Sequence, residues 1–85
     1  MKRLGIIAII VECQNECTPL EIQKLLTSYA HIIIGRLGVP DRESGYNTIS
    51  IIVKGTLEDI SALSGKLGKL KNVAVKSALT SVEIN

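Results

Sequence analysis

The stretch "TLEDISALSGKLGKLKNVAVKSAL", residues 56–79, decides the fold because a helix pattern in it is followed directly by a strand pattern. Thr56 is a good helix N-cap, and Asp59 stands three residues later, in the capping-box position. Apolar residues then recur at the spacing of one helical face, at Ile60, Leu63 and Leu67. The stretch predicts a helix over 56–68 and a strand over 72–79.

The first part of the chain repeats this design in the opposite order. Leu4–Glu12 is a near-continuous apolar run of strand length. Three helix-start signals follow, with Thr18 as N-cap, Pro19 at the first helical position and Glu21 closing a capping box. One helical face is then formed by Ile22, Leu25, Leu26 and Tyr29. We therefore expect a buried strand and then a second capped helix.

The middle of the chain supplies two more strands, over 31–38 and 48–55. Residues 39–47 carry Pro, Asp, Ser and Gly, which indicates a loop or wide hairpin turn. Residues 80–85 either prolong the last strand or fray. The order βαββαβ predicts one α+β domain over residues 1–85 with the ferredoxin-like fold. In that fold an antiparallel sheet with strand order 4-1-3-2 carries both helices on one face.

Both faces of the predicted sheet are apolar. In the first strand, residues 4, 6, 8 and 10 alternate with Ile7, Ile9 and Val11, and in the second, Ile33 and Leu37 are expected to oppose Ile32 and Ile34. The chain is 46% hydrophobic with a mean hydropathy of +0.32, more than one small core requires. Because the helices cover one face, we expect a homodimer or higher homo-oligomer to bury the other.

Composition excludes several classes of protein. The net charge of +2, from ten basic and eight acidic residues, is too balanced for a protein that coats nucleic acid, so no direct nucleic-acid binding is expected. Two cysteines do not make a secreted disulfide scaffold. The apolar run from Leu4 to Val11 is too short to span a bilayer and precedes no signal-cleavage site. These features predict a cytoplasmic protein without membrane attachment.

The lysine-rich segment 64–76 is not a phosphate-binding loop. Neither Gly-Lys pair has the preceding glycine or the following Ser or Thr of that motif, and a strand rather than a helix follows. Gly65 and Gly68 allow close packing and end the helix, while Lys66 and Lys69 complement its negative end. The alternative interpretation is an anion-binding or partner-binding surface.

Cys13, Cys17 and His31 are the candidate metal ligands. The two cysteines lie between the first strand and the first helix, where thiolates bind soft cations. Two thiolates and His31 do not complete a tetrahedral site, so a full set of ligands would have to be shared between subunits. The alternative is two ordinary reduced cysteines and a half-exposed histidine at the start of the second strand.

Arg36 is the one charged residue in the apolar second strand. It either reaches the sheet edge with its head in solvent, or lines a pocket and pairs with an acidic ligand or Glu12. No serine, cysteine or carboxylate pair forms a recognisable catalytic set, so we do not expect an enzyme. The only aromatic residues, Tyr29 and Tyr46, do not fit the base-stacking strands of an RNA-recognition domain.

The segments "LGIIAIIVE" (4–12), "GRLGVP" (35–40) and "ISALSGKLGKLKNVAVKSAL" (60–79) resemble the iron-only hydrogenase system regulators of anaerobic bacteria. The most specific matches are Arg36, Gly38, Pro40, residues 63–68, Val73, Val75 and Lys76. The resemblance implies an ACT-like domain, related to amino-acid-binding regulatory domains and to the ligand-binding half of the nickel-responsive regulator. It also implies a role in regulating hydrogenase expression or maturation, as a transcriptional regulator. It transfers no ligand, cofactor or catalytic residue.

Together these features favour a homo-oligomeric regulatory module that binds a small effector or a protein partner. Its ligand-binding residues would be Arg36, Gly38 and Pro40, with Lys66 and Gly68 nearby, since glycine permits close approach and a cation neutralises an anion. No ribbon-helix-helix or helix-turn-helix segment is present, so a sensor or partner role is expected. The alternatives are a metal sensor using the two cysteines and His31, or a small dimeric α+β enzyme.

Overall fold

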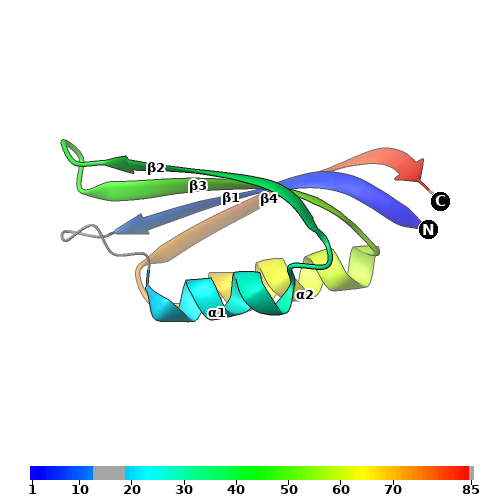
Figure 1. Ribbon diagram of the computed structural model, residues 1–85, viewed down its shortest axis with the longest axis horizontal. Helices are drawn as coiled ribbons and strands as arrows, with labels where there is room; N and C mark the ends of the chain where they lie inside the picture. Colours follow the sequence, from blue (N-terminus) through cyan, green and yellow to red (C-terminus); the bar gives the residue numbers. More distant parts are fainter. Residues whose placement is uncertain (13–18, 85) are drawn as a thin grey trace.

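The computed structural model describes residues 1–12 and 19–84. Along the chain the elements are β1 (Lys2–Glu12), α1 (Leu20–Ser28), β2 (Ile33–Asp41), β3 (Tyr46–Gly55), α2 (Leu57–Gly68) and β4 (Val73–Ile84). The strands form one antiparallel sheet in the order β2-β3-β1-β4, and both helices lie on one side of it (Figure 1). The predicted ferredoxin-like fold and strand order are confirmed.

The core lies between the sheet and its two helices. Alternate residues of the central strands point into it and pair across β1 and β3, for example Ile7 with Ile51 and Ile9 with Ile49. The helices contribute their periodic apolar residues, Ile22 and Leu26 from α1 and Ile60, Leu63 and Leu67 from α2. This apolar layer holds the helices against one face, and no helix or strand of the described residues covers the other face of the sheet.

The predicted start of α2 agrees with the structure, whereas the predicted start of α1 differs from it. The Oγ1 atom of Thr56 accepts a hydrogen bond from the backbone N–H of Asp59 at 3.2 Å, so the predicted cap of α2 is confirmed. Pro19, in contrast, is the N-cap of α1 rather than its first helical residue, because its ψ of 141° is extended. The carbonyl of Pro19 accepts the first helical hydrogen bond of α1, and Thr18 lies outside the described residues.

The strand ends extend beyond the predicted ones. β2 continues through Pro40 to Asp41, since an edge strand tolerates a proline, and the turn between β2 and β3 shrinks to residues 42–45. β2 begins only at Ile33, so His31 lies in the turn after α1 and does not open the strand. Residues 80–84 prolong β4, and their pairing with the start of β1 keeps them in the plane of the sheet.

A register shift between Ile33 and Gly35 changes which side chains of β2 share a face. Ile33 pairs with the buried Val53 and therefore faces the helices, whereas Leu37 pairs with Ser50 and faces away from them. The expectation that Ile33 and Leu37 share a face was wrong, because it assumed unbroken alternation.

Neither described helix has the length and hydropathy that a membrane-spanning helix needs.

Candidate functional site

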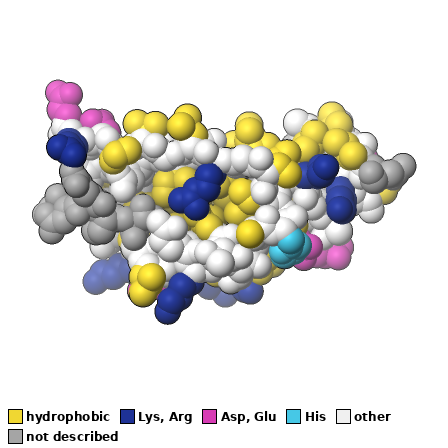
Figure 2. Space-filling view, in the orientation of Figure 1, with side chains coloured by type: hydrophobic (Ala, Val, Ile, Leu, Met, Phe, Trp, Pro, Cys, Tyr) yellow, Lys and Arg dark blue, Asp and Glu magenta, His cyan; other side chains and the backbone are white. Residues whose placement is uncertain are grey.

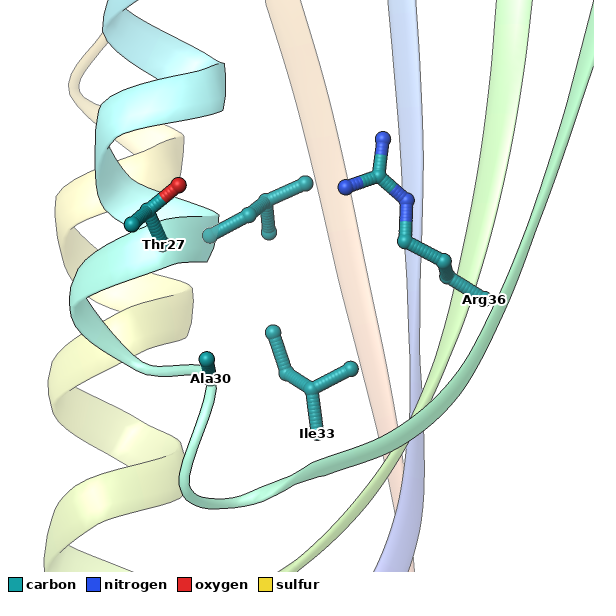
Figure 3. Close-up of a pocket in the computed structure, with 5 residues that line it drawn as sticks. Thr27, Ala30, Ile33 and Arg36 are labelled. Atoms are coloured by element: carbon teal, nitrogen blue, oxygen red, sulfur yellow. The ribbon is translucent and has the colours of Figure 1, made fainter.

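A groove separates α1 from the edge strand β2. Its cavity of about 220 Å³ is lined by Leu26, Thr27, Ala30, Ile33 and Arg36. Figure 3 shows the side chain of Arg36 extending from β2 toward α1, with Thr27 and Ala30 on the opposite wall. In the space-filling view, a basic side chain lies across the apolar hollow between the sheet and the helical layer (Figure 2).

Arg36 lies over this groove because of the register shift in β2. It pairs with Ile51, whose side chain is fully buried on the helix-facing side of the sheet. Its side chain is exposed, and no ion pair or hydrogen bond joins its guanidinium to another described residue. Glu12 follows the buried Val11 and so lies on the opposite face of the sheet. The predicted alternative of an Arg36–Glu12 pair is therefore not formed.

Gly38 and Pro40 share the helix-facing side of β2 with Arg36. They pair with Ile49 and Asn47, at the alternate positions that follow the Arg36–Ile51 pair. A Cβ atom added to Gly38 would meet no heavy atom of the described residues within 4 Å, so these residues leave open space beside Arg36 on this face. The structure thus brings together three of the five predicted ligand-binding residues.

Lys66 and Gly68 lie in the last turn of α2. The hydrogen bond and the ring contact of Lys66 are with Tyr29 and not with Arg36. The Nζ atom of Lys66 donates a hydrogen bond to the hydroxyl of Tyr29 at 2.9 Å and lies 5.2 Å from the centre of the Tyr29 ring. Tyr29 in turn stacks on His31, with 6.2 Å between ring centres. These contacts join the end of α1 to α2, which gives Lys66 a structural role.

His31 lies in the turn that follows α1. Cys13 and Cys17 fall outside the described residues. His31 follows α1, whereas residues 13–18 precede it, and a helix of nine residues is about 13 Å long. The side chain of His31 is 64% exposed, with its Nε2 atom 4.0 Å from the Oδ2 atom of Asp59. Within residues 1–12 and 19–84, no cluster of three or more His, Cys, Asp or Glu residues could hold a metal ion.

The side of the sheet without helices, here called the open face, is a continuous apolar surface. Every strand contributes large exposed side chains to it, and these are Ile6, Ile10, Ile34, Leu37, Val39, Ile52 and Val82, each between 41% and 66% exposed. A shallow hollow of about 490 Å³ lies among Leu4, Ile6, Ile34, Ile52, Ala78 and Val82. Apolar side chains line the upper, helix-free side of the molecule in Figure 2.

Sequence reasoning identified the open face and Arg36 but missed the wall that α1 provides for the groove. Thr27 and Ala30 line that wall; Thr27 is not among the periodic apolar residues of α1, and Ala30 follows the end of the helix. It also missed the contact of Lys66 with Tyr29, because the two residues are 37 positions apart. No local pattern in the sequence signals either feature.

Comparison with known proteins gives a consistent result. The family model "TM1266-like", described as "Iron-only hydrogenase system regulator, putative", matches residues 3–77. The structure of an uncharacterized protein, TM1266 from Thermotoga maritima, is 35% identical, covers 93% of this chain and 98% of that one, and superposes with a TM-score of 0.86.

A formyltetrahydrofolate deformylase from Pseudomonas putida KT2440 is similar over 88% of this chain but only 28% of its own length. With 13% identity and a TM-score of 0.58, it shares the fold alone. No protein of curated function matches the sequence at a significant level.

Proposed function

The chain belongs to the TM1266-like family of iron-only hydrogenase system regulators, and from this membership we propose that it is a regulatory module that acts by binding rather than by catalysis. The observation that carries the proposal is the guanidinium of Arg36, held over a cavity without a partner among the described residues. The described groove lining contains a cation and one hydroxyl but no acid, base or activated nucleophile. It therefore suits recognition of an anion.

We place the effector site at Arg36, Gly38 and Pro40. The three residues share one face of β2, and the space beside Gly38 gives a ligand access to the arginine. The Nζ atom of Lys66 donates one of its three N–H groups to Tyr29, so Lys66 would contribute to the site only from its position beside Tyr29, and Gly68 would only end α2. The effector would be a small molecule or an acidic group of a protein partner, bound in the cytoplasm.

We further propose that a second copy of the chain covers the open face. Apolar side chains from all four strands are exposed there, and a patch of this extent marks an interaction surface. The end of β4, the segment that could fold over this face, is paired with β1 in the plane of the sheet. A two-fold partner would bury the same apolar set on both copies. Transcriptional control would then pass through an effector or partner rather than through direct contact with DNA.

The family role is tested in a host strain that lacks the gene. We expect the transcript level or activity of its iron-only hydrogenase to change, and wild-type protein to restore it. Complementation with Arg36→Gln tests the site, since it removes the charge that faces the groove; this variant should fold but fail to restore regulation. Unchanged hydrogenase transcripts and activity in the deletion strain would refute the regulatory role.

The alternative proposal is a metal sensor that uses Cys13, Cys17 and His31. Thiolates just before a helix favour soft cations, but two thiolates and His31 leave a tetrahedral site incomplete, so a full set of ligands would have to be shared between chains. Equilibrium dialysis with zinc or iron should then show metal uptake by the wild type, and Cys13→Ser/Cys17→Ser should abolish it. Equal uptake by the wild type and the double variant would rule out the cysteine site.

A further inference from the structure

We propose that the groove between α1 and β2 binds a small branched aliphatic monocarboxylate. Its carboxylate would pair with Arg36, and its hydrocarbon tail would lie against Leu26 and Ile33. This inference rests on the proposed function, in which Arg36 belongs to the effector site, and it names the chemical class of the effector.

The guanidinium of Arg36, unpaired among the described residues, implies that the ligand is negatively charged. Arg36 is the only charged residue among those that line the groove, and its guanidinium has no partner among the described residues. The backbone of Arg36 is fixed by the sheet, opposite the buried Ile51, on the side where an apolar residue would otherwise pack toward α1. A planar guanidinium in this position binds a carboxylate through two parallel hydrogen bonds.

The chemistry of the ligand's tail is inferred from the residues that line the groove walls. Leu26 is only 3% exposed, and the other wall residues are Ile33, Ala30 and Thr27, so among the described lining residues the Thr27 hydroxyl is the one polar side-chain group besides the guanidinium. Inorganic phosphate would leave these apolar walls in contact with water, and a neutral hydrocarbon would leave Arg36 unpaired. An amphipathic anion satisfies both parts of the groove.

The volume of the groove's cavity indicates a small ligand. A cavity of about 220 Å³ is smaller than the pockets that hold drug-sized ligands. At roughly 30 Å³ per non-hydrogen atom, it accommodates about seven such atoms. 3-Methylbutanoate is therefore a probe of matching size.

The described lining also predicts weaker binding of amino acids than of carboxylates that lack an amino group. Valine is 3-methylbutanoate with an added α-ammonium group, and no carboxylate in the described lining could pair with that charge. The ammonium would lie close to the guanidinium with its own hydration partly lost, which disfavours binding. We therefore expect 3-methylbutanoate to bind more tightly than valine, although both carry the same carboxylate and a similar tail.

The test is a titration of the ¹⁵N-labelled protein, followed by amide chemical shifts. For 3-methylbutanoate we expect a dissociation constant on the order of 1 mM, with the largest shifts at Thr27, Ala30 and Gly38. Valine and 3-methylbutan-1-ol should each bind about tenfold more weakly or worse, because one adds an unpaired charge and the other lacks the anion.

Two variants remove the site in different ways. Arg36→Gln removes the cation and should weaken binding by about tenfold or more. Gly38→Val keeps the cation but fills the open space beside it, and should weaken binding comparably. Arg42→Gln, in the turn that follows β2, is the charge-matched control and should bind as the wild type does. The dispersion of the amide spectrum shows directly whether each variant is folded.

Three results would overturn the inference: no saturable shift at concentrations on the order of 10 mM, unchanged affinity in folded Arg36→Gln, or valine binding as tightly as 3-methylbutanoate. The regulatory role stands or falls separately, on the deletion strain. If the wild-type protein does not bind 3-methylbutanoate but hydrogenase regulation is still lost in the deletion strain, the carboxylate ligand is refuted. The proposed regulatory function is then unaffected.

Discussion

Replacing Ile52 by aspartate places a carboxylate at the centre of the open face. Ile52 lies on the central strand β3, opposite Ile6 of β1, and is 45% exposed in the single chain. Fully burying an isoleucine contributes about 1.5–3 kcal/mol, so covering the exposed half contributes about 1 kcal/mol per copy. The variant loses this contribution twice in a two-fold dimer.

The carboxylate adds a larger effect, because an unpaired charge in a desolvated interface costs several kcal/mol per ion. Together the two effects should weaken the dimer of Ile52→Asp by at least about 4 kcal/mol, or about a thousandfold in the dissociation constant. Sedimentation equilibrium at micromolar concentration should show the wild type as a dimer or larger assembly and the variant as a monomer. Wild-type protein that sediments only as a monomer at these concentrations would refute the role of the open face.

Leu20→Asp is the matched control. Leu20 is 64% exposed, more than Ile52, but it begins α1 in the helical layer, where an acidic side chain is favourable. This variant should assemble as the wild type does, and its dissociation would point to a general effect of charge. Should Ile52→Asp fail to fold, the melting temperature of the wild type still tests the interface, since it rises with protein concentration when only the folded state associates.

Three further predictions concern the fold and its helix ends. A Cβ atom at Gly55 would lie 2.9 Å from a methyl carbon of the buried Ile32, so Gly55→Ala should lower the free energy of unfolding by about 1–3 kcal/mol in urea denaturation. Gly65→Ala, inside α2 with open space around the added carbon, should instead raise it by about 0.5–1 kcal/mol. Thr56→Ala removes the hydrogen bond to Asp59 and should cost about 1 kcal/mol, which Thr56→Ser should largely restore.

The order of elements could be predicted because local signals agree with the fold at each step. The capping residue Thr56 and the periodic residues after it specify α2, and the continuous apolar run of β1 specifies a central strand, which pairs with a neighbour along each edge. The ends of β2 and β4 could not be predicted. Pro40 reads as a turn residue unless the strand is known to lie at the sheet edge, and residues 80–84 are held only by pairing with the distant start of β1.

The candidate site was predictable only as a set of residue types. An arginine in an apolar strand is conspicuous in the sequence, but the face it occupies depends on the register shift between Ile33 and Gly35. A single extra residue in a strand moves every following side chain to the other face. The sequence carries no sign of that shift, because pairing with β3 sets it. The contact of Lys66 with Tyr29 is likewise a result of packing, since the two residues are 37 positions apart in the sequence.

The two proposed surfaces meet on one element, the edge strand β2. Its helix-facing residues, Arg36 and Gly38, border the groove, while Leu37 and Val39 belong to the open face. β2 pairs only with β3, so only one of its edges is held by backbone hydrogen bonds. Any displacement of this strand by a ligand in the groove therefore moves part of the proposed dimer surface. Thermodynamic linkage makes the effect reciprocal, because a carboxylate that binds the dimer more tightly than the monomer must stabilise the dimer by the same factor for each ligand bound. The proposed effector site and the proposed dimer surface would therefore be coupled through opposite faces of one edge strand.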